Sequence, residues 1–382
     1  MTSRRAAVPI LATVLTLLLA GCATLAPSIP VGNAPTSAAS TTASQSAQAT
    51  ATATLSVTKV SAAAQARAQQ LGIQVYWHTN GTTTQVESAA TKVLDYVVGL
   101  GANSVGLTFP IYTDGQHPTK VYGVTGSTPS PATLDLVIKA AQARGLRVML
   151  RPLIDETNLK TSANAWRGTI DPPSVSGWFA SYRTFLTPYL QLAQQDSVNY
   201  FDVGVELVSL DYQSTQWGKF DTYAAGIYHG ELDYSDNWTS WQNGGSYAPA
   251  SNIGVDAYPD TDLTDGASVG KITDTWETWL EHRSSSVLEK TVLQEVGISA
   301  AHDAYQHPAA WGSTSTTPKT SIQVNWFAGA CAAAQALQVA GIYFWDVDSY
   351  AEPAAGATSD TGSFIGRGDQ SIKACFASGW SE

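Results

Sequence analysis

Short runs of apolar residues recur along this chain, and longer stretches with helical spacing separate them. Runs of about four to eight such residues, bounded by turn-forming residues, are typical of strands that are buried on both faces. Eight runs fit this description: 73–77, 103–109, 147–153, 200–206, 231–234, 252–258, 291–297 and 341–346. Eight strands that alternate with helices predict an α/β fold in which a parallel sheet closes into a (β/α)8 barrel.

Four of the intervening stretches predict amphipathic helices. Apolar residues recur at helical spacing over 86–98, and the pair Ser130-Pro131 predicts a capped helix start whose helix ends at Gly145. The stretches 178–194 and 322–339 are the other two. The fifth strand and the helix after it give the weakest pattern. A doubly wound open sheet is the alternative, but no Gly-rich phosphate loop follows an early strand.

Two glutamates stand at the carboxyl ends of predicted strands four and seven. Glu206 closes the run 200–206, and Glu295 lies near the end of 291–297. Because side chains alternate along a strand, we expect Glu206 to share a face with Gly204 and Asp202, and the opposite face to carry Val205 and Val203. By the same rule, Glu295 shares a face with Leu293, and the opposite face carries Gln294 and Val292.

Two acids in these strands have a chemical meaning. Hydrolysis of a glycosidic bond needs one carboxyl group to protonate the leaving oxygen and a second to attack or support the sugar carbon. The glutamates are 295 − 206 = 89 residues apart, which fits three intervening βα units. Strands four and seven lie roughly across such a barrel, so the carboxyls can approach to the ~5–5.5 Å that retention requires. The alternative is that one glutamate is a structural partner of an arginine.

Several strings resemble those of glycoside hydrolase family 113, the retaining endo-β-1,4-mannanases of clan A. They are RVMLRPLID at 147–155, WRGTI at 166–170, WFASY at 178–182, GVEL at 204–207, IGVDAY at 253–258 and QEVG at 294–297. The resemblance spans about residues 72 to 350 and implies that Glu206 is the acid/base and Glu295 the nucleophile. Two positions depart from the pattern: Val205 replaces the asparagine of most of clan A, and Leu153 stands where family 113 commonly has histidine. These departures bear on the sugar more than on the reaction.

Aromatic residues near the two acids are candidate sugar contacts. Tyr258 ends strand six, so its hydroxyl is placed either to bond Glu295 or to stand at the rim. By resemblance, Trp345 on strand eight is the platform under the sugar at the cleavage point; the alternative is a core residue, which we expect Phe344 to be. Asp346 and Asp348 follow, but no cluster with metal-ligand spacing accompanies them, and we predict neither metal nor cofactor.

Loops at the same end of the barrel supply further candidates. Trp166 and Arg167 fall in the long segment after strand three, where Arg167 either holds sugar hydroxyls or pairs with Asp155 or Glu156. Asn237 and Trp238 follow strand five, and we expect them to line a further subsite.

The N-terminal 58 residues differ in character from the rest. Arg4 and Arg5 precede an apolar stretch that ends in Leu-Ala-Gly-Cys22, which resembles a bacterial lipobox and predicts a signal peptide over 1–22 and a lipid on Cys22. The alternative is an ordinary signal with a chance cysteine. Residues 23–58 are rich in Ser, Thr, Ala and Pro and predict a disordered tether, which leaves 59–382 as the catalytic domain. We therefore expect an exported protein anchored to the cell envelope, on the outer face of the cytoplasmic membrane in a Gram-positive cell.

Composition narrows the partners. A net charge of −11 with only 13 % charged residues gives no basic surface for nucleic acid, whereas 12 tryptophans and 16 tyrosines suit stacking on sugar rings. Cys331 and Cys375 are either a disulfide or buried thiols. We expect a monomer whose partners are a polysaccharide or oligosaccharide substrate and, through the anchor, a membrane.

Together these patterns predict a retaining, endo-acting hydrolase of β-1,4-mannan or a related β-linked polysaccharide. Another clan A specificity, such as a β-glucanase or an exo-acting mannosidase, is the alternative within the enzymes. The alternative outside them is a non-catalytic carbohydrate-binding surface lipoprotein, which the presence of both glutamates disfavours.

Overall fold

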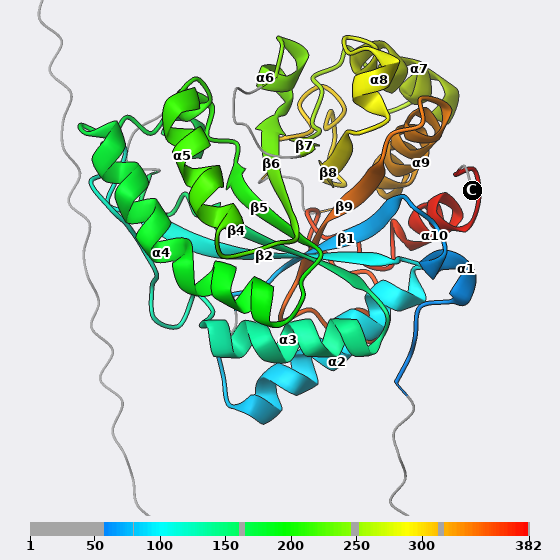
Figure 1. The fold of residues 1–382 in the computed structure, drawn as a ribbon. Coiled ribbons are helices and arrows are strands. Elements are labelled where there is room, and N and C mark those ends of the chain that lie inside the picture. The colour runs from blue at the N-terminus through cyan, green and yellow to red at the C-terminus, as the bar shows by residue number, and fades with distance from the viewer. Residues whose placement is uncertain (1–56, 79, 160–164, 246–251, 312–316, 381–382) are drawn as a thin grey trace, which may run out of the picture. The chain divides into compact units, whose positions relative to one another are not determined.

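All eight predicted strands form and lie parallel in a closed barrel. The computed structural model describes residues 57–380 apart from 79, 160–164, 246–251 and 312–316, and helices surround the strands (Figure 1). The barrel strands are β1 (Gln70–Tyr76), β2 (Ser104–Thr113), β4 (Arg147–Ile154), β5 (Tyr200–Val205), β6 (Glu231–Asn237), β7 (Asn252–Asp256), β8 (Val292–Val296) and β9 (Gly341–Asp348). The predicted signal peptide, Cys22 and nearly all of the predicted tether lie outside the described residues.

Strand pairing shows how the barrel closes. The order is β1-β9-β8-β7-β6-β5-β4-β2, and β1 also pairs in parallel with β2, with Gly72 opposite Ser104. A short strand β3 (Val121–Tyr122) pairs antiparallel with the end of β2, beyond the barrel. The fold is therefore a (β/α)8 barrel, and the open-sheet alternative does not apply.

The four strongly predicted helices form as α2 (Thr83–Gly99), α3 (Pro131–Ala143), α4 (Val175–Gln195) and α9 (Thr320–Ala336). Ser130 caps α3 by accepting the N–H of Thr133 at 3.1 Å, and Gly145 adopts φ 84° just beyond its end. The other helices are α1 (Ala62–Gln65), α5 (Ser214–Ala225), α6 (Trp238–Gln242), α7 (Val269–Leu280), α8 (Ser285–Leu288) and α10 (Asp369–Ala377), with 3-10 turns η1 (Arg167–Thr169), η2 (Val208–Leu210) and η3 (Pro353–Ala355). None of the described helices has the length and apolar character that crossing a membrane requires.

The two sides of the strands differ in chemistry. Toward the helices the strands present a continuous apolar core that includes Val105, Leu107, Phe201, Val203 and Phe344. Inside the barrel, several polar side chains are almost fully buried and hydrogen-bond one another: Gln74, Arg151, Asp202, Ser235, Asp256 and Gln294. Burial of this kind is costly unless the groups are paired, so these residues form a connected network.

β5 and β8 each contain a register shift. In both strands the shift changes which residues face the interior, compared with the simple alternation predicted from the sequence. Asp202 pairs with Asp233 but Val205 pairs with Ser235, so β5 has one extra residue between these positions. A Cβ on Gly204 would therefore meet Trp217 and Tyr234, on the helix side, at 2.8 and 2.7 Å. Simple alternation placed Gly204 with Asp202 and is wrong here, because the extra residue turns the strand.

The shift in β8 has the same consequence. Leu293 pairs with Ile342 and Val296 with Phe344, so three steps along β8 match two along β9. Leu293 packs in the core outside the barrel, whereas Val292 packs against Met149, Tyr200 and Tyr343, which come from strands on several sides of the interior. Alternation predicted that Glu295 shares the face of Leu293, and this prediction is wrong. Glu295 reaches the interior because of the extra residue.

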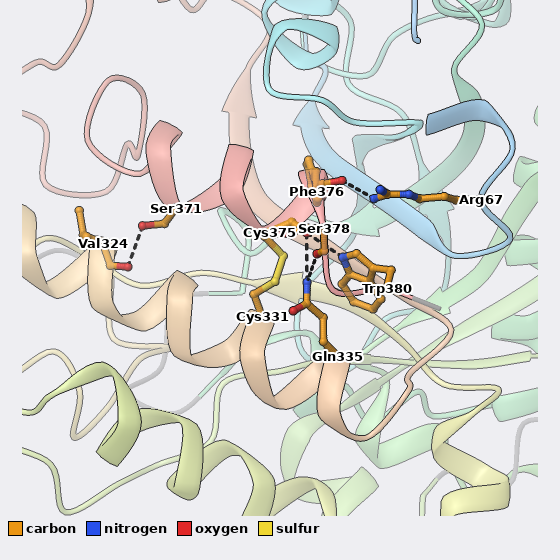
Figure 2. Close-up of a disulfide and its surroundings, with 9 residues drawn as sticks. All are labelled: Arg67, Val324, Cys331, Gln335, Ser371, Cys375, Phe376, Ser378 and Trp380. Atoms are coloured by element: carbon orange, nitrogen blue, oxygen red, sulfur yellow. Dashed lines mark hydrogen bonds between the residues drawn. A yellow bond between two sulfur atoms is a disulfide. The ribbon is translucent and has the colours of Figure 1, made fainter. Parts of the chain in front are cut away.

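A disulfide joins α9 to α10. Cys331 and Cys375 are bonded with a Cα–Cα distance of 5.8 Å, which resolves the alternative that the sequence left open (Figure 2). Gln335 donates its side-chain amide to the carbonyls of Cys375 and Ser378, and the indole N–H of Trp380 donates to the carbonyl of Cys375 at 2.8 Å. Arg67, which precedes β1, bonds the carbonyl of Phe376. The C-terminal segment is thereby attached both to α9 and to the residues that precede β1.

Candidate active site

Glu206 follows β5 immediately and has an unusual backbone. Its φ of 50° lies in the left-handed region, which is uncommon for a residue other than glycine, and its N–H donates to the carbonyl of Ser235 at 2.9 Å. One carboxyl oxygen accepts from Nη1 of Arg167 at 2.7 Å and the other from Nδ2 of Asn237 at 2.7 Å. The backbone turn and these two donors fix the direction of the carboxyl group.

Glu295 lies in β8 and also receives one donor on each oxygen. Nη1 of Arg151 donates to Oε1 at 2.5 Å, and the hydroxyl of Tyr258 donates to Oε2 at 2.7 Å. The sequence placed Tyr258 within reach of Glu295, and this contact is present. The two donors hold both oxygens of Glu295 in a fixed orientation.

Both glutamates line one cavity of about 380 Å³ at the carboxyl ends of the strands. Its other lining residues are Leu153, Glu156, Trp166, Arg167, Trp238, Tyr258, Ala309, Trp311 and Trp345. Five of the six expected sugar contacts therefore meet here. Trp345 is half-buried at the cavity wall, whereas its neighbour Phe344 is fully buried in the core as expected. A cavity of this size, with aromatic walls and a few convergent polar groups, is typical of a small-molecule or sugar site.

Asn237 lies nearer to the acids than we expected. It is buried, bonds Glu206 directly, and its Oδ1 accepts the backbone N–H of Thr239 at 3.0 Å at the start of α6. This second contact fixes the amide, so that Nδ2 points toward Glu206.

The environment of Glu206 favours its protonated form. Burial raises the pKa of Glu206, with a further rise from Glu295, while Arg167 and Asn237 act in the opposite direction. A carboxyl group whose pKa is raised by burial is suited to hold a proton near neutral pH.

Comparison with known proteins agrees with this geometry. The family model described as Glycoside Hydrolase Family 113 matches residues 72–366, which is more than half of the chain. The chain belongs to glycoside hydrolase family 113. No curated protein sequence matches it significantly.

Solved structures with a similar fold include other members of the family. A family 113 β-1,4-mannanase aligns with a TM-score of 0.68 and 17 % identity over 82 % of this chain and 100 % of its own. A family 113 β-mannanase from Alicyclobacillus acidocaldarius, solved in complex with ManMIm, gives 0.66 and 18 % over 82 % and 99 %. The endo-β-1,4-mannanase from Thermotoga petrophila gives 0.52 and 12 % over 82 % and 77 %. At these identities the likeness establishes the barrel fold.

Arg151 is the main residue of this glycoside hydrolase site that sequence reasoning did not single out. It is fully buried and contacts Glu295, Asp202 at 3.2 Å, Asp256 at 2.6 Å and Ser235 at 3.2 Å. Burial alone would lower its pKa, but the three carboxylates raise it, so the guanidinium stays charged. The available signal was an arginine in the middle of the apolar run 148–154, because a buried charge needs partners on neighbouring strands.

The carboxyl groups around Arg151 outnumber it. Burial raises the pKa of Asp202 to about 7 despite the opposing effect of Arg151, and burial also places the pKa of Asp256 well above its usual range. Three acids that share one cation cannot all ionise at low cost, so some of these protons remain bound in the folded enzyme.

A second cavity adjoins the first. It has a volume of about 490 Å³, shares Trp311 with the site, and includes Asp346, which directly follows Trp345. Asp348 in its wall contacts His78 at 2.7 Å, and Glu352 contacts Lys92 at 2.5 Å. Trp311 and Tyr350 are exposed at this end of the barrel. Sequence reasoning did not identify Trp311, because a single tryptophan in a long loop after β8 carries no periodic signal.

Proposed function

We propose that this family 113 enzyme is a retaining, endo-acting hydrolase of β-1,4-mannan or a related β-linked polysaccharide, with Glu206 as acid/base and Glu295 as nucleophile. The observation that carries the proposal is the convergence of these two carboxyl groups on one aromatic-walled cavity at the strand ends. The mannanase activities named for proteins of similar fold support the substrate class.

The contacts of each glutamate support its role. A proton donor must be neutral before the reaction, and burial raises the pKa of Glu206 toward that state. A nucleophile must present an oriented oxygen to the sugar carbon, and Arg151 and Tyr258 hold Glu295 in one orientation. The raised pKa of Glu206 therefore supports its role as the acid, and the fixed orientation of Glu295 supports its role as the nucleophile.

The reaction follows in two steps. Glu206 donates its proton to the glycosidic oxygen while an oxygen of Glu295 attacks the anomeric carbon, which breaks the glycosidic bond and forms a covalent glycosyl ester. Glu206, now ionised, then takes a proton from water as that water attacks the anomeric carbon and releases Glu295. Two inversions give net retention. We infer that Trp345, which lies in the cavity wall, stacks under the sugar.

Product stereochemistry tests the mechanism. Proton NMR of fresh products from a β-linked substrate should show the β-anomer first, because each displacement inverts the anomeric centre once. An initial α-anomer would contradict the nucleophilic role of Glu295. Activity on mannan, glucomannan, β-glucan and xylan, with product lengths followed over time, distinguishes the mannanase from a β-glucanase and endo from exo action.

Variants of the glutamates test the assignment. Glu206→Ala should lower activity on polysaccharide about 10²–10⁴-fold but spare aryl glycosides whose leaving group needs no proton. Glu295→Ala should abolish activity on both, with azide restoring activity and giving a product of inverted configuration. Wild-type activity of either variant on polysaccharide would refute the assignment. Absence of hydrolysis by the wild-type protein on all four polysaccharides would favour the non-catalytic alternative.

A further inference from the structure

Arg167 joins two carboxyl groups of the cleft through one guanidinium. It opens η1 in the segment after β4, and its Nε donates to the carbonyl of Ile154 at 2.9 Å. Nη1 donates to Glu206 at 2.7 Å, and Nη2 lies 3.3 Å from Oε1 of Glu156. The bond to Ile154 anchors the guanidinium, so its two remaining nitrogens face two acids in a fixed fork.

Glu206 faces charged or titratable groups from several other elements. Glu295 on β8 raises the pKa of Glu206, and Glu206 in turn raises the pKa of Asp256 at the end of β7 and of Tyr258 just beyond it. Arg151 on β4 is already shared among Glu295, Asp202 and Asp256. Among the ion pairs of the described residues, Arg167 is the cation in direct contact with Glu206.

This contact opposes the effect of burial. Burial raises the pKa of Glu206, and Arg167 lowers it by stabilising the carboxylate. Glu156 draws on the same guanidinium and adds a negative charge beside it, which weakens the pull of Arg167 on Glu206. The fraction of Glu206 that is protonated therefore depends on how strongly Arg167 interacts with Glu206 and how strongly with Glu156.

We propose that Arg167, shared between Glu156 and Glu206, is a positioning residue that sets the upper pH limit of hydrolysis by controlling the proton occupancy of Glu206. The inference rests on the proposed role of Glu206 as acid. It also assigns a role to Glu156, which acts on the reaction through Arg167. Neither residue donates a proton to substrate.

Two single variants should move the alkaline limb of kcat/KM in opposite directions. This limb reports the loss of the proton from the acid in the free enzyme. Arg167→Gln removes the stabilising charge, so the limb should move upward by about one pH unit or more. In Glu156→Gln, Arg167 pairs with Glu206 alone and a nearby negative charge is lost. Both changes should lower the pKa of Glu206, so the limb should move to lower pH. Profiles of the full chain are recorded on the polysaccharide that it hydrolyses best.

The double variant identifies the route of the effect. If Glu156 acts through Arg167, adding Glu156→Gln to Arg167→Gln should change the limb much less than Glu156→Gln does in the wild type. Arg167→Lys keeps the charge but loses the fork, so its limb should lie near that of the wild type while kcat falls below the wild-type value. Arg183→Gln on the outer surface of α4 is the matched control and should leave the profile unchanged.

The outcomes separate this inference from the proposed function. If Arg167→Gln and Glu156→Gln lower kcat or the melting temperature but leave the alkaline limb in place, Arg167 is a structural residue and the inference is wrong. Limbs that move in the same direction would also overturn it. If instead Glu206→Ala hydrolyses polysaccharide as the wild type does, the acid itself is misassigned and the proposed function fails.

Discussion

At the residue scale, the site depends on how individual charged side chains are paired inside a low-dielectric barrel. Arg151 forms ion pairs with Glu295 and two aspartates, and Arg167 forms ion pairs with Glu206 and Glu156. Tyr258 donates a hydrogen bond to the other oxygen of Glu295. Burial raises the pKa of both Asp202 and Glu206, and Arg151 and Arg167 respectively oppose that rise. Burial, together with the count of neighbouring cations, decides which carboxyl keeps its proton.

Trp345 is expected to act on the reaction rather than on the fold. It is half-buried against the cavity, with Arg151 5.8 Å from its ring. Since stacking strengthens as the sugar flattens toward the transition state, Trp345→Ala should lower kcat as well as raise KM, with a loss in kcat/KM of about tenfold or more. Kinetics and melting curves measured together check this.

Its neighbour provides the comparison. Phe344 is fully buried in the core, so Phe344→Ala should destabilise by about 3–5 kcal/mol and leave the kinetics of the folded fraction near normal. A Trp345→Ala variant that behaves like Phe344→Ala, with a large loss of stability and near-normal turnover, would refute the platform role.

The raised pKa of Asp202 predicts how the stability of the fold changes with pH. Its pKa rises from about 3.9 in an unfolded chain to about 7 in the barrel, so the folded enzyme binds more protons than the unfolded chain between these values. This stabilising contribution is present in full below about pH 4 and is lost as the pH rises through about 7. The contribution of Asp202 to the free energy of unfolding, measured with urea, should therefore decrease from pH 5 to pH 8.

Asparagine substitution isolates the contribution. Asp202→Asn keeps the shape of the side chain and removes its titration, so the decrease in unfolding free energy between pH 5 and 8 should be smaller than in the wild type. Asp274→Asn at an exposed position of α7 should leave the wild-type slope intact. An unchanged slope in Asp202→Asn would contradict the prediction.

At the element scale, small irregularities in two strands place the chemistry. The extra residue in β5 and that in β8 each come just before a glutamate. The one in β8 turns Glu295 to the interior, and Glu206 follows the one in β5 with a left-handed backbone. The surrounding helices are ordinary amphipathic elements that cover the apolar face of the strands. Function at this scale is located in the strand ends and the loops that follow them.

The bond between α9 and α10 should contribute to stability and not to activity. Its two cysteines are 44 residues apart, and loop closure of this length corresponds to at most about 4 kcal/mol in the chain-entropy model. Neither cysteine lines the active-site cavity. Cys331→Ser should therefore lower the unfolding free energy by about 2–4 kcal/mol with unchanged kcat.

Reduction supplies the control for that measurement. Wild-type enzyme unfolded in the presence of a reductant should match Cys331→Ser, because both lack the cross-link, and the reductant should not change the variant further. Equal stability of oxidised and reduced wild type would show that the bridge does not stabilise this fold.

At the scale of the whole molecule, we propose that a lipid on Cys22 holds the catalytic domain at the cell surface. One acyl chain binds a membrane only marginally, so stable attachment needs the two-signal anchoring that a diacylated cysteine provides. The sequence predicts that residues 23–58 form a tether, and a disordered chain of about 35 residues has an end-to-end distance of roughly 30 Å. This arrangement would suit an enzyme whose polysaccharide substrate is too large to enter the cell.

Cell fractionation tests the anchor. Cys22→Ser should release the enzyme from the membrane fraction to the medium, with unchanged specific activity of the released protein. Cys331→Ser, which leaves the lipobox intact, is the matched control and should stay with the membrane. Retention of Cys22→Ser in the membrane fraction would contradict the proposal.

The sequence by itself determined the barrel, its eight strands and the cleft to which most candidate residues belong. These features follow from local patterns: apolar runs, helical spacing, the Ser130-Pro131 start of α3, and acids at strand ends. Only the tertiary structure decided which face each strand residue occupies near Glu206 and Glu295, because a one-residue bulge depends on pairing with neighbouring strands. It also decided that Arg151 contacts Glu295 and that Arg167 contacts Glu206, and that Cys331 bonds Cys375. These contacts join residues 39 to 144 positions apart, and such pairings are set by packing and closure of the whole barrel rather than by any local preference of the chain.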